Sequence, residues 1–586
     1  MSKIKSEQNE LPHWFTQKAE SRLHLLYGEH LVEQLMERLI SRLKIEQAKN
    51  PETHTGNLWS EKDIILITYG DSIQQANERP LQTLYEFLSL HLRGSINSVH
   101  ILPYFPYSSD DGFSVIDYKT VNPALGDWSD IERIDKDFCL MTDLVINHVS
   151  RDNLWFIQYL SKQQPGSDYF IEKPEETDTS MVVRPRSTPV LMPVRTLDGV
   201  KHVWATFGED QIDVNFANPD VLFEFIDILL LYISKGSRFI RLDAVAFLWK
   251  KSGTRCINLR ETHEVVKLLR DIVDVIAPGT ILITETNVPN GENISYFGNS
   301  DEAHMVYQFT LPPLLLHALH HGNSHYLSKW TKDTPRSPKN CTYLNFLASH
   351  DGIGLRPAEG ILPQQEVQTL VDAMHEYNGY VSMRTDQFGK ESPYEINIAL
   401  FDALKGTNQG LDNYQASRFI CAHAIMIALQ GIPALYIHSL TATMNDHHGV
   451  EQSGRTRSIN RRKWQYDELL ELLNNPELPH ADIFHELKRL LNIRSKQAAF
   501  HPNADQETLS LNDKVFAFWR TSLDQHQRIL VISNISNETQ TIPLPAHPTI
   551  ADSGVWRDLI ERTALSKSTQ EIKLYPYQCT WLEALD

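Results

Sequence analysis

An arginine and an aspartate stand two residues apart in an otherwise apolar run, Arg238 to Lys250 (RFIRLDAVAFLWK). The run begins like a buried strand, and residues i and i+2 of a strand face the same side, so Arg241 and Asp243 should lie together. One interpretation is a structural ion pair, because buried charges are nearly always partnered. The other is that Arg241 lowers the pKa of Asp243 and keeps it ionised for catalysis. This segment alone leaves both open.

Polar residues also close three further apolar runs, where buried strands would end. They are Asp143, Asn147 and His148 in the first run, Glu285 in the second, and His350 and Asp351 in the third. One such carboxylate would be a weak signal, but Asp243, Glu285 and Asp351 on separate strands are hard to explain as independent structural accidents. Three carboxylates with an arginine and two histidines suit cleavage of a glycosidic bond.

That chemistry assigns a role to each side chain. Asp243 would attack the anomeric carbon, and Glu285, in the apolar surroundings of ILITETNV, would have a raised pKa and act as acid and then base. Asp351 would bind sugar hydroxyls and stabilise the oxocarbenium-like transition state, while His148 and His350 donate hydrogen bonds to the same ring. A metal site at these histidines is an alternative, but they lack the i, i+4 spacing of zinc hydrolases.

Eight short β-rich apolar runs could position these residues. They are IILITYG, SVHILPY, CLMTDLVIN, RFIRLDAV, ILITETN, MVYQFTL, TYLNFLASH and IPALYIH. Amphipathic helical stretches such as THEVVKLLRDIVDVIA stand between them. The alternation predicts an α/β fold, a closed parallel (β/α)₈ TIM barrel and not an open sheet, with the active site at the carboxyl ends of the strands.

The remaining segments divide the chain into further expected units. Residues 1–60 read as an N-terminal helical extension, the barrel as three parts (61–148, 216–352 and 411–500), and residues 501–586 as an all-β sandwich domain. The connections at 149–215 and 353–410, after the third and seventh strands, are longer than a barrel loop requires. We expect both insertions to form lids or subdomains over the site.

Composition limits the class of protein and its partners. A chain of 586 residues is too long to form one ordinary hydrophobic core, and its 41% content of hydrophobic residues is typical of a globular protein. No apolar run reaches the roughly 18 residues of a membrane helix. The formal charge of −19, from 55 basic and 74 acidic residues, disfavours nucleic acid and anionic membranes as partners. An anionic small molecule would therefore need a local basic pocket.

Two features favour a cytoplasmic location. The N-terminal MSKIKSEQNE is polar and does not resemble a secretion signal. The five cysteines lack metal-type spacing, and their odd number argues against a complete disulfide framework, so we expect reduced thiols. The sequence does not indicate the oligomeric state.

Several segments resemble a known family. DLVINH, RFIRLDAVAF, ILITETN and FLASHDG are similar to the four conserved regions of glycoside hydrolase family 13, the α-amylase family. LITYGD, VHILPYFPYSSDDGFSVIDY, LGDWSDIE, RPRSTPV, EDQID and SINRRKW resemble its sucrose phosphorylase subfamily, over about residues 62–580. Within that subfamily, ETNVPNGENISYFG, ASHDGIG with GILP, and SPYEINIALFDAL resemble the glucosylglycerate phosphorylases.

The resemblance implies the same catalytic roles: Asp243 as nucleophile, Glu285 as acid and base, and Asp351 as stabiliser of the transition state. The positions that match residues gripping the first glucose are Asp110, His148, Gln211, Arg241, His350 and Arg461. Phe247 departs from the family, since it stands where the subfamily usually has a tyrosine. Asn147 matches a calcium ligand of amylases, but the phosphorylase branch generally lacks that ion. We therefore expect no metal and no cofactor, with inorganic phosphate as co-substrate.

Phosphorolysis requires that phosphate compete with water for the glucosyl-enzyme, so the protein must bind the dianion. Arg184 and Arg186 of RPRSTPV match a phosphate-contacting position of the family; the alternative is a solvated basic turn. Arg384 lies in GYVSMRTDQFGKESPYE, whose composition is typical of a mobile loop. The glucosylglycerate branch has a basic residue there, so Arg384 would pair with a glycerate carboxylate, unless it is a solvated loop arginine.

The predicted function is reversible phosphorolysis of a small α-glucoside to α-glucose 1-phosphate by double displacement. The predicted glucoside is 2-O-α-glucosylglycerate, with sucrose and glucosylglycerol as alternatives. A hydrolase or transglucosidase of the same family is a rival interpretation. A second rival is a non-catalytic member, such as the heavy subunits of amino-acid transporters, but those carry a membrane helix and lose the catalytic carboxylates.

Overall fold

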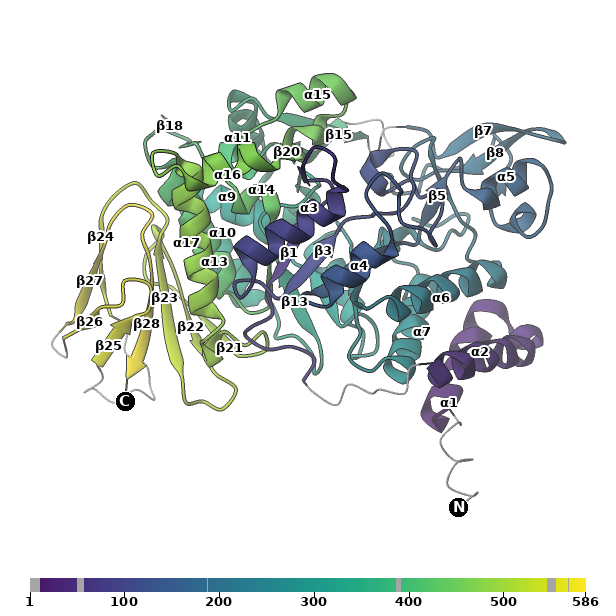
Figure 1. The fold of residues 1–586 in the computed structure, drawn as a ribbon, viewed down its shortest axis with the longest axis horizontal. Coiled ribbons are helices and arrows are strands. Elements are labelled where there is room, and N and C mark those ends of the chain that lie inside the picture. The colour runs from purple at the N-terminus through teal and green to yellow at the C-terminus, as the bar shows by residue number, and fades with distance from the viewer. Residues whose placement is uncertain are drawn as a thin grey trace, which may run out of the picture.

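The computed structural model describes residues 11–49, 57–186, 188–385, 391–544, 555–566 and 569–585. Its first elements are the helices α1 (His13–Tyr27) and α2 (Glu29–Lys49), which pack together and against α7 (Arg260–Ile276) (Figure 1). Arg22 of α1 is buried and donates to Asp271 at 2.7 Å and to Glu264 at 2.9 Å. This ion pair network fixes the helical pair on the outside of the barrel.

Eight parallel strands form a closed barrel in the order β1-β19-β13-β12-β11-β10-β4-β3. They are β1 (Ile65–Thr68), β3 (Ser98–Ile101), β4 (Cys139–Val145), β10 (Ser237–Asp243), β11 (Ile281–Thr284), β12 (Met305–Tyr307), β13 (Thr342–Asn345) and β19 (Ile432–Tyr436). Seven of them lie within the predicted runs and β10 begins one residue before its run, so the predicted TIM barrel is confirmed. The strands read as continuous apolar runs because both faces of a parallel sheet are covered.

Helices connect and surround these strands (Figure 1). The longer ones are α3 (Pro80–Phe87), α4 (Trp128–Asp135), α6 (Pro219–Ser234), α9 (Leu311–His321), α10 (His325–Asp333), α13 (Gln415–Ala428), α16 (Tyr466–Asn474) and α17 (Pro479–Arg494). Capping residues in the sequence determine where these helices begin. Asn218 caps α6 by accepting from the Asp220 amide, with Pro219 in the first turn, and Asp127 and Asp130 form a capping box at α4.

The segment after β4 forms short antiparallel strands. They are β5 (His148–Ser150), β6 (Glu172–Lys173), β7 (Leu191–Thr196), β8 (Gly199–Trp204) and β9 (Gln211–Asp213), with the helix α5 (Leu154–Leu160) after β5. β5 pairs with β9, so that His148 stands opposite Asp213 and Ser150 opposite Gln211. This pairing brings the two ends of a long segment back to the mouth of the barrel.

The segment after β13 contains a three-stranded sheet. Its strands are β14 (Ile353–Gly354), β16 (Glu391–Asn397) and β15 (Tyr380–Thr385), in that order, and the helix α11 (Gln364–Glu376) precedes β15. The sequence prediction of a mobile loop around Arg384 is wrong for the described part, because Arg384 lies in β15 opposite Ser392 of β16. Residues 386–390 of that predicted loop lie outside the described residues.

The C-terminal end is all β, as expected (Figure 1, yellow). One sheet contains β21 (Asp505–Leu509), β22 (Val515–Thr521), β23 (Arg528–Asn534), β28 (Cys579–Leu585), β25 (Val555–Asp558) and β26 (Ala564–Leu565), and a second pairs β24 (Gln540–Pro543) with β27 (Glu571–Leu574). Trp519 and Leu530 of the first sheet share a core with Ile542 and Leu574 of the second. Apolar contact between the sheets therefore holds this unit together.

Short elements complete the fold. They are β2 (Ile73–Gln74) paired with β20 (Trp464–Gln465), β17 (Gly406–Thr407) paired with β18 (Gly410–Leu411), α8 (Asn290–Ile294), α12 (Leu400–Ala403), α14 (Ile437–Leu440) and α15 (His447–Ser453). Among the residues that the structure describes, no helix is both long enough and apolar enough to cross a membrane.

Candidate active site

A cavity at the carboxyl ends of the barrel strands gathers residues that are far apart in the sequence. Eight of the predicted site residues line it: Asp110, His148, Arg186, Gln211, Asp243, Glu285, His350 and Asp351. The other lining residues are Phe113, Phe207, Ala244, Ala246, Phe247, Thr286, Asn287, Tyr394 and Arg457. The cavity therefore combines carboxylates, cations and aromatic rings, as a sugar site requires.

Arg241 and Asp243 lie side by side at the end of β10, as the i, i+2 spacing predicted. Arg241 Nη1 donates to Asp243 Oδ1 at 2.7 Å and also pairs with Asp143, which stands opposite it on β4. Asp143 is fully buried, and its other oxygen lies 2.6 Å from His100 Nε2. One guanidinium is thus shared between two carboxylates.

The structure corrects the predicted pKa of Asp243. Burial alone would raise the pKa of Asp143, but Arg241 and His100 lower it to about 2. Burial raises the pKa of Asp243 well above its ordinary value, Arg241 opposes this only in part, and Glu285 adds to it. The prediction that Arg241 would hold the pKa of Asp243 low is therefore wrong, because burial outweighs the effect of Arg241 and the surrounding carboxylates add to the rise.

Glu285 directly follows β11 and faces the same cavity. Its Oε2 accepts a hydrogen bond from the Ala244 amide at 2.9 Å, next to Asp243 in the chain. Ala244 has a φ of 52°, a left-handed conformation that costs energy for a residue other than glycine. Burial raises the pKa of Glu285, and the negative charge of Asp351 contributes, as its apolar surroundings predicted.

Two neighbouring carboxyl groups whose pKa values are both raised can share one proton. Asp243 and Glu285 are such a pair. One member is then an anion and the other an acid, which is the combination that retaining cleavage of a glycosidic bond needs.

Asp351 is the third carboxylate, and the charges around it differ. His350 Nε2 lies 3.5 Å from its Oδ2, and Arg457 Nη1 lies 2.7 Å from its Oδ1. Burial would raise the pKa of Asp351, but His350, Arg457 and Arg241 hold it well below its usual range. Asp351 is therefore a permanent anion in the cavity, suited to stabilising positive charge.

Arg457 is a residue that the sequence predictions missed. It lies in a short 3₁₀ helix (Thr456–Asn460) and binds Glu395 of β16 through Nη2 at 2.6 Å and Nε at 2.9 Å, besides Asp351. It does not lie at the end of a barrel strand, which is where the sequence predicted functional residues. The sequence feature that could have identified Arg457 is its position four residues before Arg461, in the segment GRTRSINRRKW.

The predicted glucose-binding residues gather around Phe113. His148 Nε2 donates to the Phe113 carbonyl at 2.9 Å, and the His350 ring stacks on the Phe113 ring with centroids 4.7 Å apart. Gln211 Nε2 lies 3.3 Å from His148 Nε2 and 3.5 Å from Asp110 Oδ2. Polar atoms and an apolar ring together suit the hydroxyls and the face of a sugar.

Phe247 contributes an apolar wall where the family resemblance implies a tyrosine. Its ring lines the cavity and packs edge-on against Phe207, with centroids 5.3 Å apart. The substitution leaves a phenyl ring in place and offers no hydroxyl to the sugar.

Three of the predicted arginines, Arg184, Arg384 and Arg461, do not line the cavity. Arg461 lies behind it, donating to the His350 carbonyl at 2.8 Å and to Asp111 Oδ2 at 2.6 Å. Arg384 pairs with Glu359 and donates to Ser392 Oγ at 3.1 Å. Arg184 is half-buried and is not among the lining residues, whereas Arg186 is. The predicted binding roles of these arginines stay predictions.

Asn147, the position that matches a calcium ligand of amylases, contacts a lysine. Lys250 Nζ donates to Asn147 Oδ1 at 2.7 Å and lies 2.6 Å from Asp213 Oδ2. Lys250 and Asp213 are both buried, and Asp213 stands opposite His148 in the β5–β9 pair. An ammonium group therefore supplies positive charge at this position.

Comparisons with known proteins agree with this geometry. A family model described as the α-amylase catalytic domain matches residues 93–353. A glucosylglycerate phosphorylase of Escherichia coli is 41% identical over 571 residues, which cover 97% of this chain and 100% of that protein. Another, of Allomeiothermus silvanus, is 46% identical over 83% of this chain and 87% of that protein.

The chain belongs to the α-amylase family, glycoside hydrolase family 13. Its fold is similar to that of a sucrose 6F-phosphate phosphorylase from Thermoanaerobacter thermosaccharolyticum, with a TM-score of 0.72 at 24% identity, covering 88% of this chain and 98% of the other. The segments that resemble the four conserved regions of the α-amylase family supply Asp143 to His148, Arg241 with Asp243, Glu285, and His350 with Asp351. All three carboxylates are in place, which opposes a non-catalytic member of this family.

Proposed function

We propose that the protein is a retaining α-glucoside phosphorylase, a hexosyltransferase, that cleaves 2-O-α-glucosylglycerate with phosphate to α-glucose 1-phosphate and glycerate. The observation that carries the proposal is that Arg186 lines the same cavity as Asp243, Glu285 and Asp351. An arginine near the reacting carboxylates suits a phosphate dianion or a glycerate carboxylate. The full-length similarity to glucosylglycerate phosphorylases supports the choice of substrate.

In the first step Glu285 donates its proton to the glycosidic oxygen as Asp243 attacks the anomeric carbon. The carbon–oxygen bond to glycerate breaks, glycerate leaves as an alcohol, and a covalent glucosyl-Asp243 ester forms. Asp351 stabilises the positive charge that develops on the sugar ring, because its own charge is fixed by His350 and Arg457.

In the second step phosphate occupies the place that glycerate has left. Glu285 accepts a proton from the attacking phosphate oxygen, the ester bond to Asp243 breaks, and α-glucose 1-phosphate forms with net retention. The cation of Arg186 would raise the local concentration of the dianion, which gives phosphate its advantage over water.

The acceptor would lie among residues outside the catalytic carboxylates. Asn287 and Tyr394 line the cavity together with Arg186, and Asn287 Oδ1 is buried without a hydrogen-bond partner among the described residues. That oxygen is suited to a hydroxyl of the acceptor. The pairing of Arg384 with a glycerate carboxylate remains part of the proposal, and it would require Arg384 to leave Glu359.

Substrate class is tested in the synthetic direction. The enzyme is incubated with α-glucose 1-phosphate and equal concentrations of D-glycerate, glycerol or fructose, and phosphate release is measured. We expect glycerate to give the highest kcat/KM. Preference for glycerol or fructose would instead assign a glucosylglycerol or a sucrose phosphorylase, and release that does not depend on any acceptor would assign a hydrolase.

The setting of the reaction follows from the same proposal. A small glucoside and phosphate are the partners, with no cofactor, nucleic acid or membrane surface required. None of the five cysteines, all of them described, is in a disulfide, which supports a reducing compartment, and we propose the cytoplasm.

A further inference from the structure

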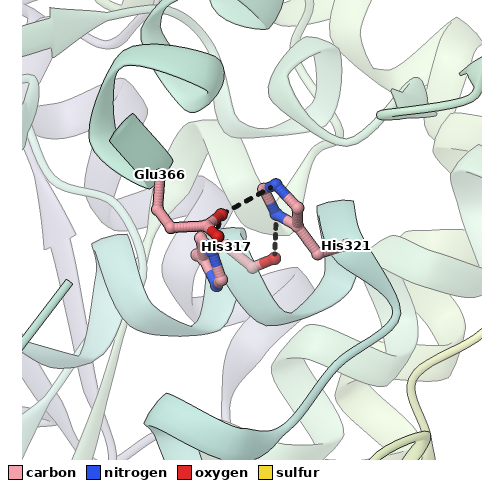
Figure 2. A group of neighbouring side chains, drawn as sticks. All are labelled: His317, His321 and Glu366. Carbon is pink, nitrogen blue, oxygen red and sulfur yellow. Dashed lines mark hydrogen bonds and ion pairs between the residues drawn. The ribbon is translucent and has the colours of Figure 1, made fainter. Parts of the chain in front are cut away.

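Two helices outside the active-site cavity bring a pair of histidines and a glutamate together. His317 and His321 lie one turn apart on α9, which follows barrel strand β12, and Glu366 lies in the first turn of α11. Figure 2 shows both imidazole rings and the carboxylate converging on one point between the helices. None of the three lines the active-site cavity, so the proposed reaction does not account for them.

The spacing of the three side chains is that of a metal site. His317 Nε2 lies 3.0 Å from Glu366 Oε2, and His321 Nε2 lies 3.3 Å from the same oxygen (Figure 2). One ligand atom from each residue lies within 4.8 Å of the others. Bonds of about 2.0–2.2 Å in a tetrahedral zinc site place ligand atoms roughly 3.3–3.6 Å apart, so small side-chain movements would suffice.

Hydrogen bonding leaves a lone pair of His321 aimed at the carboxylate. His321 Nδ1 lies 3.0 Å from the His317 carbonyl oxygen, and because a carbonyl only accepts, Nδ1 must carry the hydrogen. In the neutral ring Nε2 is then a bare acceptor, and it faces another acceptor, Glu366 Oε2. Two facing lone pairs repel each other unless a proton or a metal ion lies between them. The same backbone hydrogen bond orients metal-binding histidines generally.

The burial of the group favours a bound ion over a hydrated surface cluster. The His317 side chain is 3% exposed, so bulk water does not surround its ring. The side chains of His321 and Glu366 are 15% and 35% exposed, which leaves a route for an ion and a bound water. Two neutral imidazoles and a carboxylate are ligands that Zn²⁺ binds readily.

We propose that His317, His321 and Glu366 bind one Zn²⁺ ion, with water at the fourth position. The ion would tie α9 of the barrel to α11, which leads into β15 and β16. Because Glu395 of β16 holds Arg457 against Asp351, the bound ion would stabilise the segment that completes the active site. Its role is structural, and the inference stands apart from the choice of glucoside.

Zinc binding is measured directly on the full chain, purified without a histidine tag, stripped with a chelator and dialysed. Titration calorimetry and elemental analysis should give one tightly bound Zn²⁺ per chain, and Co²⁺ should give the visible absorption of a tetrahedral site. Zn²⁺ should raise the Tm of the stripped protein by about 2 °C or more.

Variants assign the site to these residues. His321→Ala and Glu366→Gln should each weaken Zn²⁺ binding at least about tenfold. Both side chains are partly exposed, and melting in chelator checks that the variants fold. His375→Gln is the matched control, since His375 is an exposed histidine of α11 outside the cluster, and it should bind Zn²⁺ like the unchanged protein.

The proposal fails if the unchanged protein binds no zinc, or if His321→Ala and His375→Gln bind it equally. It also fails if acidification stabilises the stripped protein through His321 while Zn²⁺ has no effect, since a proton and not a metal would then bridge His321 and Glu366.

Discussion

The carboxylates of the cavity and its arginines are carried by different parts of the chain. Asp243 and Glu285 stand at the ends of β10 and β11, where the parallel ladder fixes the backbone. Arg186 and Arg457 come from segments outside the barrel strands, and Arg457 is held by its ion pair with Glu395. The comparison indicates that the barrel places the carboxylates, whereas the arginines of the cavity come from segments that can change without disturbing the barrel.

The largest expected effect is on the barrel side, at the nucleophile. Asp243→Asn keeps the shape of the side chain but cannot attack the anomeric carbon, so turnover should fall at least about 10⁴-fold. Circular dichroism and thermal melting should show an intact fold. Near-normal activity in the folded variant would remove Asp243 from this role.

The second largest effect is expected at Glu285, and it distinguishes the acid/base residue from the nucleophile Asp243. Glu285→Gln should slow cleavage of ordinary glucosides by about 10²–10⁴-fold, because the leaving oxygen is no longer protonated. An α-glucoside with a good leaving group needs no proton, so it should still load the variant, and mass spectrometry should detect the glucosyl-enzyme. If no adduct accumulates from such a substrate, the acid/base assignment is wrong.

A third test concerns Arg457, which connects Glu395 of β16 to the catalytic carboxylate Asp351. Arg457→Met leaves Glu395, which is 1% exposed, without its cation, and an unpaired buried carboxylate costs about 3–5 kcal/mol of unfolding free energy. The double variant with Glu395→Leu should recover most of that loss in denaturant melts while remaining less active, because Asp351 still lacks Arg457. Additive losses of stability would show that the pair is not coupled.

The smallest effect is expected at the acceptor. Arg384→Ala should weaken glycerate use at least tenfold, since a charge-assisted pair contributes roughly 1.5–3 kcal/mol, and should spare glycerol. Arg186→Ala is the comparison, because Arg186 lines the cavity while Arg384 pairs with Glu359. Equal losses for glycerate and glycerol in Arg384→Ala would show that this arginine does not read the carboxylate.

The sequence predicts the barrel and its carboxylates well for a physical reason. Strands buried on both faces are continuous apolar runs, and a polar residue that ends such a run, as Glu285 does, is conspicuous. Contacts between distant segments leave no such pattern. The pairing of Arg457 with Glu395, the sharing of Arg241 with Asp143, and the contact of Lys250 with Asn147 each depend on tertiary structure.

The pKa of Asp243 shows the same limit. Spacing along β10 placed Arg241 beside it correctly, but burial has the largest effect on the pKa of Asp243, and the neighbouring strand supplies Asp143, which shares the cation. The direction of a pKa shift depends on every charge around the group, so one neighbour read from the sequence was not sufficient.

The most direct test of the central claim is the fate of 2-O-α-glucosylglycerate with and without phosphate, followed by phosphorus and proton nuclear magnetic resonance. Double displacement through Asp243 with phosphate as acceptor predicts stoichiometric release of glycerate and of the α anomer of glucose 1-phosphate, with little turnover when phosphate is omitted. Free glucose formed at the same rate in the absence of phosphate, or a β-configured phosphate ester, would contradict the account.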